Sequence, residues 1–168
     1  MRKGVVSGGP FAQNEFCFDY TMPSCAHHVT AEGLQDCSLV PTVDPVCKST
    51  CQSNTAINYA NDHHFASSSY SLNGVDNIKQ DIYNYGTVTA AFTVYMDFLT
   101  YESGVYQHTT GAAEGGHAIK LIGWGTENGQ DYWLAVNSWN NTWGDKGTFK
   151  ILQGDCGIDN QVHAGLAL

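Results

Sequence analysis

Gly115-Gly116-His117-Ala118-Ile119 is followed, at the end of the next apolar run, by Val136-Asn137-Ser138-Trp139. A histidine can serve as a general base near neutral pH because its pKa lies close to the working pH. Its second ring nitrogen needs a partner that fixes the tautomer and the direction of the ring. The amide oxygen of Asn137 can do this without adding a second negative charge, which suits a site that holds a thiolate and an imidazolium. We therefore predict that His117 is a catalytic base and that Asn137 orients it.

The two motifs lie on a predicted hairpin. Apolar runs at 117–124 and 131–139 are joined by residues 125–130, and Asn128-Gly129 is a strong turn dipeptide. Such a hairpin places the start of one strand beside the end of its neighbour, so the two side chains should meet. Trp139 is expected on the same strand face as Asn137, where its indole would shield the pair from water. Gly115 and Gly116 allow backbone or substrate to approach closely in front of the histidine.

Residues 70–168 are expected to combine one helix with an antiparallel sheet. Val75, Ile78, Ile82 and Tyr85 share a helical face, Asn73 is the expected cap, and Gly86 ends the helix. Strands are predicted at 88–95, 104–108 and 148–152, beside the hairpin. The fold class is therefore α+β, with an antiparallel, barrel-like sheet and one flanking helix.

Residues 1–69 have little apolar periodicity and many cysteines, which favours a disulfide-rich loop region. Five of the six cysteines lie there, and this density indicates an oxidising compartment. A metal-binding domain is the alternative, because histidines are plentiful. No second cysteine pair with the spacing of zinc ligands follows, however, so we expect no metal and no organic cofactor.

The charge balance argues against a nucleic-acid partner. The sequence contains seven Lys and Arg residues but sixteen Asp and Glu residues, and phosphate binding needs clustered basic residues. No run reaches the length of a membrane span, and the first residues hold no apolar stretch long enough for a signal peptide. An oxidised chain without a visible signal sequence is explained if the natural N-terminus lies upstream of Met1.

A series of short motifs gives the chain a specific family resemblance. They are Gly-Gly-His-Ala-Ile, Gly-Trp-Gly, Tyr-Trp-Leu, Asn-Ser-Trp, Trp-Gly-Asp-Lys-Gly and Cys-Gly-Ile, in order from 115 to 158. Together they resemble the C-terminal half of papain-family cysteine peptidases. Pro23-Ser24-Cys25-Ala26-His27-His28, closed by Cys37, is similar to the occluding loop of the cathepsin B-like group, here residues 20–38.

The resemblance implies a papain-like fold and a role for each matched residue. His117 is the base, Asn137 its orienting partner and Trp139 the shield, with Gly115 and Gly116 in support. His27 and His28 would receive the C-terminal carboxylate of a substrate, which implies carboxydipeptidase besides endopeptidase activity. Gln161 replaces an acidic residue of the substrate pocket. The implied disulfides are Cys25–Cys37 and Cys17–Cys51, which leaves Cys47 and Cys156 unpaired.

The chain also departs from the family pattern. In papain-type enzymes the nucleophile lies about 130–150 residues before these partners, and only 116 residues precede His117. We therefore expect the N-terminal helical half, with its cysteine, to be missing, and the isolated chain to be inactive. The expected partners are peptide or protein substrates, the missing half, and a propeptide or cystatin-like inhibitor. A lysosomal, vacuolar or secreted location follows from the resemblance. A non-catalytic relative that binds peptides or inhibitors is the alternative.

Overall fold

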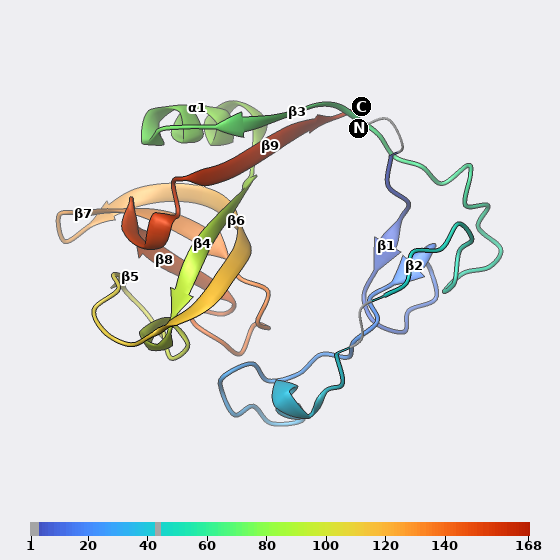
Figure 1. Ribbon diagram of the computed structural model, residues 1–168, viewed down its shortest axis with the longest axis horizontal. Coiled ribbons are helices and arrows are strands. Elements are labelled where there is room, and N and C mark those ends of the chain that lie inside the picture. The colour runs from blue at the N-terminus through green and yellow to red at the C-terminus, as the bar shows by residue number, and fades with distance from the viewer. Residues whose placement is uncertain (1–3, 43–44) are drawn as a thin grey trace.

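The computed structural model describes residues 4–42 and 45–168. Its N-terminal loop region, residues 4–42 and 45–65, contains only short elements: strands β1 (Gly8–Gly9) and β2 (Phe18–Asp19), which pair in parallel, and the 3-10 turn η1 (Cys37–Leu39). The rest of the chain forms one sheet with a helix beside it (Figure 1). The mostly irregular loop region and the predominance of sheet after it agree with the expected α+β fold.

Seven strands form the sheet, in the order β3-β9-β4-β6-β7-β8-β5. The sheet is open, with β3 and β5 at its two edges, rather than a closed barrel. All neighbours are antiparallel except β5 and β8, which pair in parallel, so the sheet is mostly antiparallel, as expected. The strand bounds are β3 (Ala66–Leu72), β4 (Val88–Tyr95), β5 (Val105–Tyr106), β6 (Ala113–Glu127), β7 (Gln130–Val136), β8 (Thr148–Leu152) and β9 (Gln161–Ala167).

Helix α1 (Val75–Tyr85) confirms the helix predicted from the apolar spacing. Ile78 and Ile82 are buried against the sheet, and Gly86 ends the helix with a positive φ of 102°. The expected cap was wrong: the N-cap residue is Gly74, and no side chain caps the helix. The backbone carbonyl of Asn73 instead accepts a hydrogen bond from the side chain of Asn77.

The hairpin is confirmed, with strands β6 and β7 joined by the two residues Asn128 and Gly129. Both turn residues have positive φ, 52° and 79°, as a two-residue turn between twisted strands requires. The hairpin extends to Glu127 and Gln130, further toward the turn than the apolar runs indicated. Strand β7 ends at Val136, before Asn137.

Strands β3 and β9 were missed by the sequence prediction, and β3 also moves the boundary set at residue 70. They pair with each other along most of their length, and β9 pairs with β4 as well. The backbone N–H of Leu168, directly after β9, donates a hydrogen bond to the carbonyl of Phe65, directly before β3. Because β3 starts at Ala66, the sheet begins four residues before the predicted boundary at residue 70.

An aromatic cluster forms the centre of the core. Phe98, in the 3-10 turn η2 (Met96–Phe98), is fully buried and contacts the rings of Trp143 and Phe149, with centroids 5.0 Å and 4.9 Å away. The Trp143 indole also donates to the Leu99 carbonyl over 2.8 Å. Aromatic rings supply large buried area and specific edge-to-face contacts. This cluster gives the neighbouring loops a rigid support.

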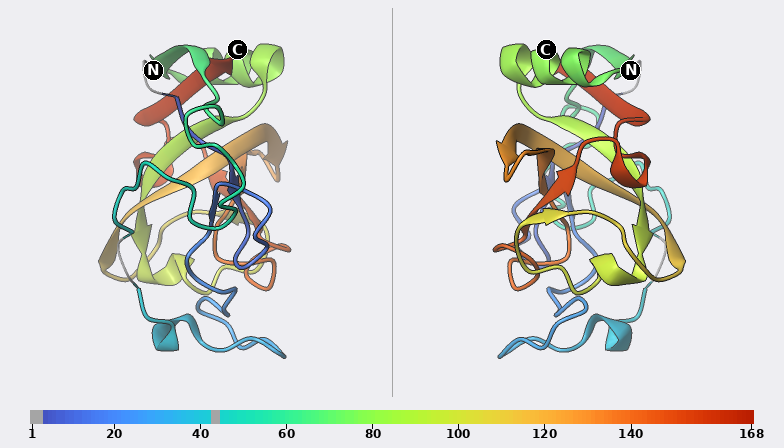
Figure 2. Two further views of the ribbon diagram at one scale, coloured as in Figure 1. Left: turned by 90° about the vertical axis from the view of Figure 1, so that its right-hand side faces the viewer. Right: turned by 90° about the vertical axis from the view of Figure 1, so that its left-hand side faces the viewer.

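Figure 2 shows the loop that carries η1 at the end of the molecule opposite α1. The third 3-10 turn, η3 (Asp155–Gly157), precedes β9. Within the part of the chain that the structure describes, no helix is both long and apolar enough to cross a bilayer.

Candidate active site

The side chains of His117 and Asn137 are joined by a hydrogen bond of 2.8 Å between Nε2 and Oδ1. The same amide oxygen accepts the backbone N–H of Ser138 over 2.7 Å. Since a backbone N–H can only donate, this second bond fixes which amide atom faces the ring. The oxygen then requires the histidine proton on Nε2, which leaves Nδ1 as the atom that can take up a proton in the neutral ring.

Nδ1 of His117 has no hydrogen-bond partner among the described residues, and it does not belong to the buried unpartnered atoms. It is therefore open to a reacting group. The amide nitrogen of Asn137, by contrast, is buried and has no partner among these residues. Such a group costs about 1–3 kcal/mol unless something binds it.

Both residues lie at the end of the hairpin opposite its turn, His117 on β6 and Asn137 directly after β7. His117 lies on β6 opposite Phe92 of β4, with ring centroids 5.9 Å apart. Beyond Val136 the chain leaves the sheet, and the Asn137 N–H donates to the Gly147 carbonyl over 2.9 Å. The prediction that Asn137 and Trp139 share a strand face was therefore wrong, because β7 has already ended.

Trp139 nevertheless covers the histidine. Its indole stacks on the His117 ring with centroids 5.0 Å apart and an interplanar angle of 25°. Only 8% of Trp139 is exposed, and its other contacts include Phe98 and Trp143 of the aromatic cluster. The core thus holds the indole against the His117 ring.

Gly115 and Gly116 leave space in front of His117. A Cβ added to either residue would meet no atom within 4 Å, and both residues are exposed. They line a hollow of about 180 Å³ together with His117 and Trp139. Gly115 has a φ of 138°, a backbone conformation that residues with a side chain rarely adopt.

The loop between Cys25 and Cys37, named here the histidine loop, is closed by a disulfide between these two residues. Its ends are also joined by backbone bonds, from Ala26 N–H to the Gln35 carbonyl and from Cys37 N–H to the Ala26 carbonyl. The loop brings His27 and His28 to Trp139. The His27 ring is stacked on the indole, and the His28 ring meets it edge-on with centroids 4.9 Å apart.

Burial is the main cause that lowers the pKa of both loop histidines. Repulsion from His28 and His117 lowers the pKa of His27 further, while Asp36 opposes these effects. For His28, Asp36 and Glu114 oppose the effect of burial. Nδ1 of His27 is buried and has no partner among the described residues. Both rings are therefore neutral at neutral pH and gain charge only in acid.

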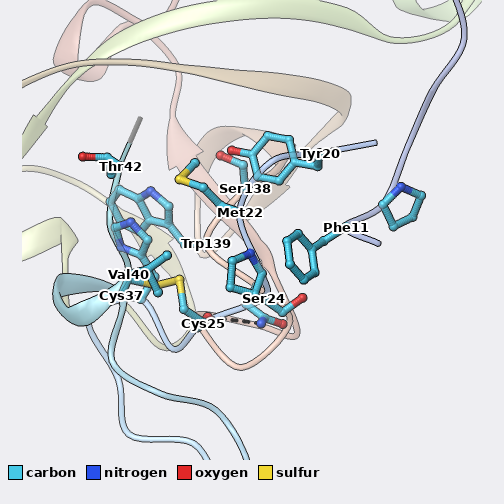
Figure 3. A pocket seen from close by; sticks show the side chains of 14 residues that line it. Phe11, Tyr20, Met22, Ser24, Cys25, Cys37, Val40, Thr42, Ser138 and Trp139 are labelled. Atoms are coloured by element: carbon cyan, nitrogen blue, oxygen red, sulfur yellow. Dashed lines mark hydrogen bonds between the residues drawn. A yellow bond between two sulfur atoms is a disulfide. The ribbon is translucent and has the colours of Figure 1, made fainter. Parts of the chain in front are cut away.

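A larger hollow of about 540 Å³ borders the histidine loop (Figure 3). Its walls include the Cys25–Cys37 disulfide, His27 and Trp139, and the apolar side chains of Phe11 and Met22. Two segments far apart in sequence, the histidine loop and the chain after β7, thus meet at one surface.

Gln161 lines a separate hollow of about 220 Å³ together with Gly116 and Cys156. This hollow adjoins the glycines in front of His117, so the expected substrate-pocket residue lies near the candidate base. Burial, followed by the negative charge of Asp155, raises the pKa of the Cys156 thiol to about 12. Cys156 is therefore held as a thiol and not as a thiolate.

The remaining cysteines lie in the N-terminal loop region. Cys17 is joined to Cys51, and Cys47 is exposed and unpaired among the described residues. The partly buried Cys156 is also unpaired among them. Cys17 and Cys51 also lie close to Asp62. Their sulfur atoms are bonded to each other, so they are not available as metal ligands in this state.

Sequence reasoning missed Asn140. Its side-chain amide donates to the Cys25 carbonyl over 3.2 Å and so ties the histidine loop to the segment that carries Asn137 and Trp139. Asn140 has a φ of 74°, a left-handed conformation that asparagine tolerates better than most residues. The Asn140-Asn141 pair directly after the tryptophan was the available signal for a tight turn at this point.

Comparison with known proteins identifies the family of this chain. The family model described as papain family cysteine protease matches residues 11–166. The chain therefore belongs to the papain family of cysteine proteases. Among its relatives, "Cathepsin B-like cysteine proteinase" of Schistosoma japonicum is 43% identical over 99% of this chain and 49% of the relative. "Cathepsin B-like cysteine proteinase 3" of Ostertagia ostertagi is 42% identical over 98% of this chain and 95% of the relative.

A solved structure of a cathepsin B proenzyme also resembles this chain. The "proCathepsin B S9 from Trypanosoma congolense" superposes with a TM-score of 0.68 at 36% identity, covering 74% of this chain and 42% of that one. The chain is thus cathepsin B-like within the family. It spans about half the length of the Schistosoma relative and of the Dictyostelium discoideum protein "Cathepsin B", to which it is 47% identical.

Proposed function

We propose that this chain supplies the histidine-bearing half of a cathepsin B-like peptidase that hydrolyses peptide bonds in proteins. The observation that carries the proposal is the bond from His117 Nε2 to Asn137 Oδ1, with Nδ1 left open beside two glycines. An imidazole held in this way is ready to exchange a proton with a thiol. The nucleophile is a cysteine of the complementary half of the papain-like fold.

The proposed reaction proceeds in two stages. The cysteine thiolate attacks the peptide carbonyl, and His117 as an imidazolium gives its Nδ1 proton to the leaving amine, so that the C–N bond breaks and an acyl-enzyme remains. The neutral His117 then takes a proton from water, whose oxygen displaces the thiolate. Asn137 keeps the ring in place through Nε2 during both stages.

The isolated chain is proposed to be inactive because none of its own cysteines suits the role of the nucleophile. Four are held in disulfides, and Cys47 belongs to the N-terminal loop region. Cys156 lines the Gln161 hollow, but its raised pKa leaves it protonated. The unpartnered amide of Asn137 is also consistent with a binding group that the complementary half supplies.

His27 and His28 are proposed to bind the C-terminal carboxylate of a substrate, which adds carboxydipeptidase activity. The position of the two histidines supports this proposal, because both rings contact Trp139 and Trp139 stacks on His117. Gln161 is proposed to line a substrate pocket, where its neutral amide weakens binding of an arginine side chain by about 1–3 kcal/mol relative to a carboxylate.

The proposed partners are peptide and protein substrates, the nucleophile-bearing half, and a propeptide or cystatin-like inhibitor. The solved relative is itself a proenzyme by its name. The proposed location is the lysosome, a vacuole or the extracellular space. Disulfides persist in oxidising compartments, and the two disulfides are consistent with such a location.

Complementation tests the proposal. This chain is refolded together with the N-terminal half of the Schistosoma relative, and hydrolysis of a fluorogenic dipeptide amide is measured. Turnover is expected from the pair, not from either part, and His117→Ala should abolish it. Hydrolysis by the chain alone would refute the proposed inactivity. A folded pair that binds a cystatin but hydrolyses nothing would favour the non-catalytic alternative.

A further inference from the structure

A polar hollow of about 390 Å³ lies between the end of β3 and one face of α1. This volume falls in the range of small-molecule sites in proteins. The hollow is at the end of the molecule that carries α1, opposite the histidine loop (Figures 1 and 2). It shares no lining residue with the hollows around His117, and the proposed peptidase reaction does not use it.

A buried carboxylate forms part of this hollow. Asp81 is only 7% exposed, and its Oδ1 accepts a hydrogen bond from the Tyr70 hydroxyl over 2.8 Å. Oδ2 accepts no hydrogen bond within residues 4–42 and 45–168, yet it is not among the enclosed unpartnered atoms. This oxygen is therefore accessible from the hollow, and a bound hydroxyl group would satisfy it.

Amide side chains surround the carboxylate. Asn77, Gln80 and Asn84 recur at a spacing of three or four residues, so they share one face of α1 with Asp81. Asn77 donates to the Asn73 carbonyl, whereas Gln80 and Asn84 form no side-chain hydrogen bond with other described residues. Each free amide presents a donor and an acceptor side by side.

An exposed aromatic ring completes the hollow. Tyr85 is 64% exposed and lies at the end of the same helix. A ring in this position offers an apolar face beside polar groups. Tyr83, two residues earlier, is 83% exposed but does not line the hollow, which makes it a matched control.

These groups favour one class of ligand. An anion would meet the Asp81 carboxylate on a chain of net charge −9. A cation is also disfavoured, because the hollow offers it a single free carboxylate oxygen and because the amide side chains present N–H donors, which do not bind cations. Adjacent hydroxyls, each a donor and an acceptor, match both the amides and the carboxylate, and the C–H face of a sugar ring suits Tyr85. We propose that the hollow between β3 and α1 binds a neutral saccharide unit.

The test is a titration of the full chain with methyl α-mannoside, N-acetylglucosamine and maltose, followed by backbone amide NMR. At least one sugar should shift the resonances of residues 71–85 with millimolar affinity. Asp81→Asn and Tyr85→Ala should each weaken binding about tenfold or more, because a hydrogen bond to a charged group or the stacking surface is lost. Asp76 is exposed in the first turn of α1 and does not line the hollow. The controls Asp76→Asn and Tyr83→Ala should therefore bind as the parent chain does.

Because Asp81 is buried, Asn84→Ala provides a surface variant that leaves the core intact and should also weaken binding. Absence of any shift at 50 mM sugar, equal weakening by the two control variants, or equal shifts with glycerol would each overturn the proposal. So would shifts with arginine methyl ester in place of the sugars, because these would assign the hollow to a cation. None of these outcomes bears on peptide hydrolysis, so the peptidase proposal is tested independently.

Discussion

The imidazole of His27 and the indole of Trp139 are nearly parallel, with ring centroids 5.0 Å apart and an interplanar angle of 6°. The same indole stacks on His117. The histidine loop and the candidate catalytic base thus pack against the same side chain.

Removal of the His27 ring is expected to open the histidine loop. An aromatic pair of this kind contributes about 0.5–1.5 kcal/mol, so His27→Ala should speed cleavage after the exposed Glu32 by a glutamyl endopeptidase about 2- to 12-fold. Mass spectrometry after reduction of the Cys25–Cys37 disulfide would measure the rate. Cleavage after Glu15, outside the loop, serves as the internal control.

His64→Ala is the matched variant, because His64 is exposed and does not contact Trp139. Equal rates after Glu32 in the parent and in His27→Ala would show that the stacking does not hold the loop.

Acid is expected to weaken the same closure. Burial lowers the pKa of His27 and His28, so the open loop binds more protons than the closed loop as the pH falls below about 6.5. The stability of the closed loop therefore rises with pH and is lost toward acid. The ring resonances of His27 and His28 should titrate below pH 6.5, and His28→Ala should raise the pKa of His27 by removing a like charge. A pKa of His27 above 6.5 would contradict this.

Asn137→Ala should leave the fold intact and lower peptidase activity of the complemented enzyme by about 10²-fold, because the ring of His117 loses its orientation. Initial rates with a dipeptide amide would measure this. Asn141→Ala, an exposed neighbour, is the control and should retain full activity. Similar rates for the two variants would refute the orienting role.

The two glycines before His117 are expected to respond differently to alanine. Gly115→Ala should destabilise the fold by about 1–3 kcal/mol, since its φ of 138° is strained for a residue with a Cβ. Gly116 has no such φ, and its Cβ would meet open space. Gly116→Ala should therefore keep its stability in urea unfolding but raise KM of the complemented enzyme. Equal stability of both variants would contradict the strain.

Cys47 and Cys156 should differ in reactivity. At pH 8 a thiol with a pKa of about 12 is ionised in about one molecule in 10⁴. Iodoacetamide should therefore label the exposed Cys47 quickly and leave Cys156 almost unmodified, as peptide mass spectrometry would show. Asp155→Asn should speed labelling of Cys156 by removing a nearby negative charge. Fast labelling of Cys156 in the parent chain would contradict its raised pKa.

Local signals were sufficient for part of the fold. The helix at Val75–Tyr85 and the strand at Val88–Tyr95 follow from periodicity and β-branched residues, and Asn128-Gly129 defines the hairpin turn. The meeting of His117 with Asn137 followed from that hairpin and needed no long-range information.

Other parts depend on contacts that no local pattern carries. Strand β3 is rich in serine, and β9 contains Gly165, so neither has a strong intrinsic preference for a strand. They form because they pair with each other at one edge of the sheet, although they lie far apart in the sequence. Trp139 likewise stacks on His117 because the aromatic cluster holds its indole there. The alternation of side chains along a strand, from which the contact was predicted, is not the cause.

The two ends of the described chain are tied to consecutive residues. Val5 exchanges two backbone hydrogen bonds with His64, and Leu168 donates one to Phe65. A short peptide linker could therefore close the backbone into a ring, with new termini cut at the Asn128-Gly129 turn. In such a circular permutant the order of the elements changes, while β6 with His117 and the segment after β7 with Asn137 keep their places. Modules joined next to Val5 and next to Leu168 would be attached close to each other on the molecule.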